Sequence, residues 1–124
     1  MSHDTVSDAL NQIMNAKKSG KSEVILKNHS KFLLNVLAIG KLKKYIAEYN
    51  VADGGVRVVF GSLHFCKAIK PRYLVKSITI DKYIRRYLPA RGMGILIIST
   101  SHGLMTHQTA LDKKLGGSLI AYFY

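Results

Sequence analysis

Hydrophobic residues are distributed along this 124-residue sequence in many short runs rather than in one long block. None of the runs approaches the ~18 consecutive apolar residues that a membrane-spanning helix needs. Because 48% of the residues are hydrophobic, the chain can still bury a core, so it is not expected to be a disordered basic tail. We therefore expect one folded domain, or two small subdomains, built from short helices and strands.

In the N-terminal half, the apolar period changes from helical to strand-like and back. Asp4 and Ser30 precede the two helical patterns, and their side-chain oxygens are suited to cap the free backbone N–H groups there. Asp53-Gly54-Gly55 separates two β-rich runs, which is a strong hairpin signal. Residues 17–21 (KKSGK) are polar and are predicted to form a loop. The expected elements are a helix over 5–16, a strand over 23–27, a helix over 31–43 and hairpin strands over 45–51 and 56–60.

The C-terminal half predicts further short elements of both kinds. Thr79 and Thr106 are expected to cap helices, Pro89 to stop the first of these, and Gly116-Gly117 to interrupt the chain before a final strand. The expected elements are strands over 72–77 and 93–98, a short strand at Leu104 and Met105, a strand over 118–123, and helices over 80–87 and 107–114. Together the two halves predict an α+β fold of two small α+β subdomains packed against each other, residues 1–62 and 63–124.

The sequence is strongly basic, with 19 Lys and Arg against 7 Asp and Glu and a formal net charge of +12. Residues 1–62 contribute +4 and residues 63–124 contribute +8. The charges occur singly or in pairs within periodic sequence, so they decorate a folded surface. Because so large an excess repels itself unless a partner neutralises it, a polyanion is the expected partner, and nucleic acid is the commonest one.

The cysteine content and the N-terminal sequence indicate a cytoplasmic protein. The first twenty residues contain charged residues and no apolar block, so no secretory signal is expected. Cys66 is the single cysteine, which excludes an internal disulfide and fits a reducing compartment.

A catalytic alternative is suggested by the Ser99-x-Ser101-x-Gly103 pattern after an apolar strand, which imitates a hydrolase nucleophile elbow. In that hypothesis a small enzyme would use Ser101 with His107. The chain is far too short for the hydrolase scaffold, however, and the predicted helix begins too late for a tight strand-to-helix turn. The competing interpretation is a hydroxyl-rich turn that satisfies its own backbone.

No metal or cofactor is expected. Zinc requires four thiolate or imidazole ligands at recognisable spacing, and the available residues include one cysteine and no paired ligand motif. The glycine pairs 54–55 and 116–117 do not precede helices in a phosphate-binding pattern, so we interpret them as turns. The residues considered as ligands are His64, Cys66, His102 and His107.

Aromatic residues are interleaved with basic ones in the C-terminal half. They can belong to the core, or they can stack on splayed RNA bases. The residues concerned are Tyr73, Tyr83, Tyr87, Tyr122 and Phe123.

Residues 94–107 (GILIISTSHGLMTH), followed by Gly116-Gly117 and an aromatic end, resemble the C-terminal signature of the universal small-subunit ribosomal protein S8 family. Residues 68–73 (AIKPRY) are similar to a connector of its archaeal and eukaryotic type, which is called S-fifteen-A in eukaryotes. The opening helix with Asn15, the Ser30-Lys31 helix start and residues 88–90 (LPA) extend the resemblance to nearly the whole chain. This resemblance implies that the protein is a structural constituent of the small ribosomal subunit and not an enzyme. It also implies the two-subdomain fold predicted above.

The resemblance also implies a site. Members of the family bind the central domain of small-subunit rRNA, help to organise the platform during assembly, and contact neighbouring ribosomal proteins. The C-terminal subdomain makes the main contact, and His102 occupies a variable position of its motif. An additional role in binding mRNA that resembles the rRNA site stays open. Carried over residue by residue, the recognition motif comprises Ser99, Thr100, Ser101, Gly103 and Met105.

Basic side chains should add phosphate contacts around this motif. A secondary anchor is expected in the N-terminal subdomain, where flexible lysines lie near a helix start that favours anions. Lys44 stands where many family members have glycine, the hairpin over 50–61 is shortened, and Tyr83 lies near a position where eukaryotic members carry tryptophan. The main basic residues are Lys70, Arg72, Arg85, Arg86 and Arg91, and those of the secondary anchor are Lys17, Lys18, Lys21, Ser30 and Lys31.

Overall fold

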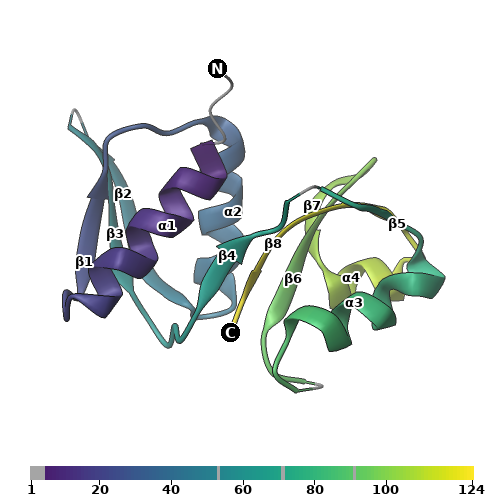
Figure 1. The fold of residues 1–124 in the computed structure, drawn as a ribbon. Helices are drawn as coiled ribbons and strands as arrows, with labels where there is room; N and C mark the ends of the chain where they lie inside the picture. The colour runs from purple at the N-terminus through teal and green to yellow at the C-terminus, as the bar shows by residue number, and fades with distance from the viewer. Residues whose placement is uncertain (1–4, 53, 71, 91) are drawn as a thin grey trace. The chain divides into compact units, whose positions relative to one another are not determined.

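The computed structural model describes residues 5–52, 54–70, 72–90 and 92–124 of the chain. These residues form two compact units, Met1–Lys67 and Ala68–Tyr124, each built from helices and antiparallel strands (Figure 1). The α+β class predicted from the sequence is thereby confirmed. Four residues with predicted roles lie outside the described ranges: Asp4, Asp53, Pro71 and Arg91.

The N-terminal unit is a three-stranded antiparallel sheet, in the order β1-β3-β2, with two helices packed on it. Helix α1 contacts β1 and α2, and α2 contacts β2 (Figure 1). The elements are α1 (Thr5–Lys18), β1 (Glu23–Leu26), α2 (Lys31–Leu42), β2 (Ile46–Ala52) and β3 (Gly55–Phe60).

Helix α1 buries the apolar face that its periodicity predicted, but it is longer than predicted. Lys17 and Lys18 belong to its last turn rather than to a loop. Lysine is a good helix former, and a cation in the last turn interacts favourably with the helix dipole, so the helix continues to Lys18. Gly20 has a φ of +81°, a conformation that ends helices. The buried residues are Val6, Ala9, Leu10, Ile13, Met14 and Ala16.

Helix α2 begins where its capping residue predicted. Ser30 is extended, with φ −140° and ψ 164°, and its hydroxyl oxygen accepts from the backbone N–H of Leu33 at 3.2 Å. This bond satisfies one of the free N–H groups of the first turn. The helix ends at Leu42, with Lys43 as its C-cap, one residue earlier than predicted.

The hairpin predicted around the glycine pair joins β2 to β3, with Ala52 opposite Gly55. Gly55 has a φ of +125°, and a Cβ at this position would collide with the backbone of Leu26 in β1. The sequence identified the turn, whereas the close approach of a third strand became visible only in the folded unit.

The second sheet of the chain has five strands, in which β4-β8-β6-β7 follow one another and β5 pairs with β8, and all of them except β4 lie entirely in the C-terminal unit. The whole of Ile95 to Ile98 is buried in β6, as the apolar run predicted. The three residues of β4, at the boundary of the two units, are too few to show an alternating pattern and were not predicted. The elements are β4 (Cys66–Ala68), β5 (Leu74–Val75), the 3₁₀ turn η1 (Ser77–Thr79), α3 (Ile80–Tyr87), β6 (Ile95–Thr100), β7 (Gly103–Thr106), α4 (His107–Asp112) and β8 (Gly117–Phe123).

The cap predicted for α3 is wrong, although the bounds of the helix are as predicted. Thr79 has φ −107° and ψ 0°, and its side chain makes no capping bond to α3. Instead its hydroxyl donates to the carbonyl of Lys76 at 3.0 Å and accepts from the N–H of Lys76 at 3.2 Å. Because η1 directly precedes α3, Thr79 closes that turn rather than opening the helix. The strand predicted over 72–77 is correspondingly reduced to β5.

Candidate nucleic-acid interface

The recognition motif forms a β-hairpin rather than a loop. Strands β6 and β7 pair up to Thr100 opposite Gly103, so the turn consists of Ser101 and His102. Both turn residues are exposed. Ser99 and Thr100, which follow the strand predicted over 93–98, are the last residues of β6. The hairpin therefore presents two side chains at its tip and uses the rest of the motif as strand.

Thr100 fixes the conformation of this turn. Its hydroxyl donates to the carbonyl of Gly103 at 2.9 Å and accepts from the N–H of His102 at 3.0 Å. With both functions used inside the hairpin, Thr100 positions the tip. The interpretation that the motif satisfies its own backbone is therefore correct for Thr100.

Gly103 is required by its backbone conformation. Its φ is +106°, and a Cβ there would meet no atom within 4 Å. The space around the start of β7 is open, so a side chain at this position would strain the backbone without a collision. That open space also leaves the backbone of the turn accessible.

Ser99 is held beside the last strand of the sheet. It is paired with Leu104 in β7 and with Ser118 in β8. A Cβ at Gly117 would collide with the carbonyl group of Ser99, so the second glycine of the Gly-Gly pair allows β8 to approach β6. The sequence predicted these glycines only as a break in the chain, because the strand that needs the space is distant in sequence.

Met105 is part of the hydrophobic core of the C-terminal unit. Only 8% of its surface is exposed, and it packs with Leu96 and Ile98 of β6 and Ala110 of α4. It therefore supports the hairpin from inside the unit.

The geometry contradicts the hypothesis of an enzyme with Ser101 and His107. His107 is 5% exposed, and its Nδ1 accepts from the backbone N–H of Leu96 at 3.1 Å. Leu96 and Thr100 are four residues apart along β6, which corresponds to about 13 Å at the rise of a strand. Ser101 lies beyond Thr100, in the turn of the hairpin. The imidazole is thus a buried structural group that is out of reach of the Ser101 hydroxyl.

The basic residues of helix α3 are held in place by their neighbours. The guanidinium carbon of Arg86 lies 5.5 Å from the ring centre of Tyr73 and 5.4 Å from that of Tyr87. Arg85 forms an ion pair with Asp81 at 3.6 Å, in which 76% of the arginine side chain stays exposed. Because such exposed pairs contribute little, Arg85 keeps its capacity to bind a phosphate. Lys70 and Arg72 are also exposed.

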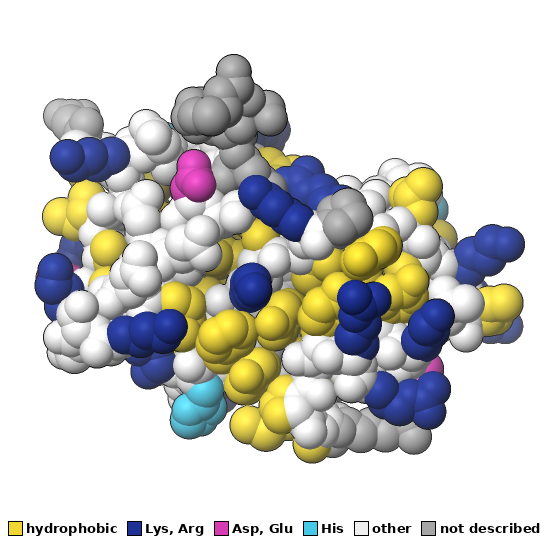
Figure 2. Space-filling model, in the orientation of Figure 1, with side chains coloured by type: hydrophobic (Ala, Val, Ile, Leu, Met, Phe, Trp, Pro, Cys, Tyr) yellow, Lys and Arg dark blue, Asp and Glu magenta, His cyan; other side chains and the backbone are white. Residues whose placement is uncertain are grey.

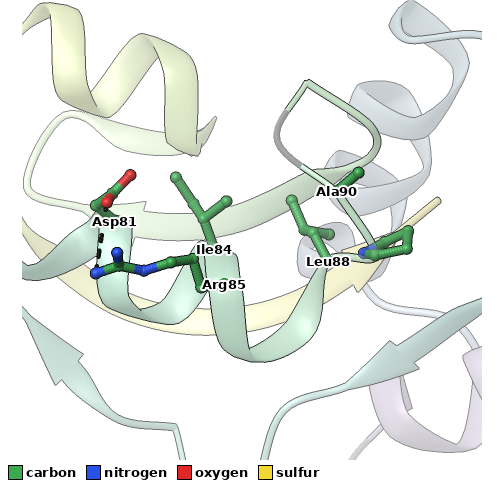
Figure 3. A pocket seen from close by; sticks show the side chains of 6 residues that line it. Asp81, Ile84, Arg85, Leu88 and Ala90 are labelled. Carbon is green, nitrogen blue, oxygen red and sulfur yellow. Dashed lines mark ion pairs between the residues drawn. The ribbon is translucent and has the colours of Figure 1, made fainter.

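A small pocket lies along the same helix (Figure 3). The Asp81–Arg85 ion pair lies at one end of the residues drawn, and Leu88 and Ala90 lie at the other. Ile84 contributes an apolar wall between them. The pocket combines apolar walls with one partly neutralised guanidinium, and it holds no pair of groups suited to acid–base chemistry.

The predicted aromatic residues divide into two groups. Phe123 is fully buried. The four tyrosines are half-buried beside the core, with ring centres 6.0 Å apart for Tyr73 and Tyr83 and 5.1 Å apart for Tyr87 and Tyr122. Burial raises the pKa of Tyr87, and the charge of Arg86 opposes this effect. These rings pack mainly against one another and against the core.

The residues of the secondary anchor are not equivalent. The Ser30 hydroxyl is engaged as the cap of α2, and Lys17 is half-buried at the end of α1. Lys18, Lys21 and Lys31 are exposed. Three lysines of the N-terminal unit thus remain fully available to an anion.

Charge is distributed over the surface rather than gathered in one block. Figure 2 shows Lys and Arg side chains spread over the visible face, on which Asp and Glu are sparse. Arg57 and Glu23 form an ion pair across β3 and β1 in the N-terminal unit. The visible face is therefore mainly positively charged.

The potential ligands for a metal are dispersed. Among the described residues, no three His, Cys, Asp or Glu side chains are grouped so that they could hold a metal ion. The Cys66 thiol is buried, donates to the Leu10 carbonyl at 3.9 Å, and has its pKa raised by burial to about 12. Its neutral form packs in the interior. The helices in the described ranges also include none that is long and apolar enough to cross a membrane.

A strongly basic sequence on a folded domain is the electrostatic signature of a nucleic-acid-binding protein. The sequence matches the family model for ribosomal protein S8 over residues 4–124, nearly its full length. The chain belongs to the ribosomal protein S8 family. It is therefore a structural constituent of the small ribosomal subunit, with rRNA and other ribosomal proteins as partners, in a family that is not one of enzymes.

Proposed function

We propose that this protein binds the central domain of small-subunit rRNA and helps to organise the platform during assembly of cytoplasmic ribosomes. In this proposal the C-terminal unit makes the main contact through the β6–β7 hairpin. The observation that carries it is the exposed Ser101-His102 tip, whose conformation is fixed by Thr100.

The chemistry of the tip suits an RNA helix. An A-form helix exposes 2′-hydroxyls and base edges in a wide, shallow groove, where a short side chain can come close. The Ser101 hydroxyl can both donate and accept there, and the His102 imidazole can do the same in its neutral form. Gly103, with open space beside it, lets the backbone approach the groove.

The basic side chains act in a different way. Lys70, Arg72, Arg85 and Arg86 would bind phosphates around the site, and so would Arg91, which lies outside the described residues. Lys18, Lys21 and Lys31 would form a second, sequence-independent anchor on the N-terminal unit. Each phosphate contact releases condensed counterions, so the affinity should fall steeply with salt.

The Ser101→Ala variant tests whether the hairpin recognises its target. The substitution removes one exposed hydroxyl and leaves the net charge unchanged. We expect cognate rRNA binding to weaken roughly tenfold, since a lost hydrogen bond with a buried partner costs about 1–3 kcal/mol. Binding to unrelated duplex RNA should stay the same, because it depends on charge.

Ser62→Ala is the matched control, because Ser62 is an equally exposed serine of the N-terminal unit. It should alter neither affinity, and both variants should unfold at the wild-type temperature. A parallel loss of cognate and unrelated RNA in Ser101→Ala would overturn the assignment of recognition to this hairpin.

A further inference from the structure

Three helices of this protein end in the same backbone motif. In α2 the N–H of Tyr45 bonds the carbonyl of Gly40 at 2.9 Å, and the N–H of Lys44 bonds that of Lys41 at 3.0 Å. This pair of reversed bonds is the Schellman motif, which places one residue in the left-handed conformation. Helices α1 and α4 repeat it, with Lys21 N–H to Ala16 at 3.0 Å and Leu115 N–H to Ala110 at 2.9 Å.

The left-handed position is occupied by different residues in the three helices. It is Gly20 in α1, with φ +81°, as the motif ordinarily requires. In α2 it is Lys44, with φ +70°, and in α4 it is Lys114, with φ +55°. These two lysines are the only non-glycine residues with positive φ in the described part of the chain. A residue with a Cβ is disfavoured in this conformation, because the Cβ crowds the following carbonyl.

Backbone bonds hold this conformation, including one from the Ser62 N–H to the Lys44 carbonyl at 2.9 Å, but none of them requires a lysine side chain. Both lysines are exposed, and no ion pair among the described residues engages either ammonium group. A cation near the carbonyl end of a helix is favourable, but Lys43 and Lys113 already provide one at each helix end. Gly20 shows that the motif itself needs no lysine.

We propose that Lys44 and Lys114 are rRNA phosphate contacts, one on each unit, retained although glycine would stabilise the free protein. A side chain that strains the backbone, and whose charge no ion pair in the described residues engages, points to a functional position. Both exposed lysines lie just beyond the C-cap of a helix and carry compact point charges, which suit contact with a phosphate rather than with a base. The inference rests on the proposed rRNA binding and adds two residues to it.

Lys44→Gly and Lys114→Gly test the inference, because each removes the strain and the charge together. Each substitution should raise the unfolding temperature by about 3 °C. Each should also weaken rRNA binding about five- to tenfold at 0.1 M salt, and lower the slope of log affinity against log salt by about one. A variant that is more stable and binds more weakly is the expected signature.

Lys43→Gly and Lys113→Gly are the matched controls. They remove the same charge one residue earlier, where φ is −94° and −89°. Neither should raise the unfolding temperature, and each should lose less affinity than the neighbouring variant. If Lys43→Gly were as stabilising as Lys44→Gly, relief of charge repulsion rather than of strain would be the cause, and the inference would fail.

Two further results would overturn the inference while leaving rRNA binding intact. One is a stabilised Lys44→Gly or Lys114→Gly variant with wild-type affinity and salt slope. The other is an equal loss of affinity in the controls, which indicates general attraction by the charged surface. Absence of rRNA binding by the wild-type protein would instead refute the proposed function, and with it this inference.

Discussion

Two hairpins of this protein have a glycine with positive φ as the first residue of their second strand, and the two glycines are needed for different reasons. Gly55 opens β3, the central strand of its sheet, where β1 lies so close that a side chain would collide with Leu26. Gly103 opens β7, at one end of the strand order, and has open space beside it. Similar local sequence signals thus place one glycine in a buried position and the other in an exposed one.

The difference follows from the position of each glycine in its sheet. Each hairpin pairs a central strand with an edge strand, but the glycine begins the central strand β3 in the first hairpin and the edge strand β7 in the second. A central strand has a neighbour on both sides, so Gly55 is buried against β1. An edge strand has one open side, so Gly103 is exposed, and a partner can approach the turn beside it.

The largest expected effect is a difference in stability between variants that replace Gly55 and Gly103 by alanine. Gly55→Ala combines a collision with an unfavourable φ and should lower the free energy of unfolding by about 3 kcal/mol. Gly103→Ala places a Cβ at an unfavourable φ without a collision, and it should lower the free energy of unfolding by about 1 kcal/mol. Urea denaturation of both variants measures the difference. Equal losses would show that the two turns are under the same constraint.

Labelling of Cys66 sharpens the comparison, because this thiol lies in the same unit as the first hairpin. With its pKa raised to about 12, the thiol should stay nearly unreactive at pH 9, where an exposed thiol is largely ionised. Gly55→Ala should accelerate labelling about a hundredfold by favouring opening of the N-terminal unit. Gly103→Ala should leave the rate near that of the wild type, and acceleration in both variants would show that the units open together.

Exchange of the second turn tests whether its side chains or only its shape matter. Ala-Ala in place of Ser101-His102 is compatible with this turn, because neither residue has positive φ, and it keeps the net charge. The variant should unfold near the wild-type temperature, yet bind cognate rRNA about tenfold more weakly. Gel-shift titrations with cognate and unrelated RNA provide the measurement. Undiminished cognate binding would mean that the backbone alone is recognised.

The smallest expected effect concerns the residue that fixes the tip. Thr100→Val keeps the shape of the side chain but removes its bonds to Gly103 and His102. We expect a loss of about 1 kcal/mol in stability and a weakening of cognate binding by a few fold, because the tip becomes less ordered. Line broadening of the Ser101 and His102 amide resonances would report this motion. Unchanged resonances together with weakened binding would assign Thr100 a direct contact instead.

Local signals in the sequence predicted much of this fold. The apolar period identified the buried face of α1, Ser30 identified the start of α2, and the glycine pair 54–55 identified the hairpin of β2 and β3. These features depend on residues within one or two turns of each other, so they can be read from a single sequence. The bounds of α3 were predicted for the same reason.

The errors arose where a distant or neighbouring element changed the local preference. Thr79 has the composition of a helix cap, yet the 3₁₀ turn before α3 engages its hydroxyl. Gly117 was identified as a break, because its contact with Ser99 exists only after β8 has paired with β6. Lys44 and Lys114 could not be assigned a left-handed conformation from lysine propensities, which favour helix.

The position of the hairpin tip in an assembled small subunit tests the central claim most directly. Cryo-electron microscopy of a small subunit that contains this protein would show the surroundings of Ser101 and His102. We predict that both side chains lie about 3 Å from groups in a groove of the central-domain rRNA. A tip that faces solvent or another protein, with rRNA covering the end of the β2–β3 hairpin instead, would contradict the account.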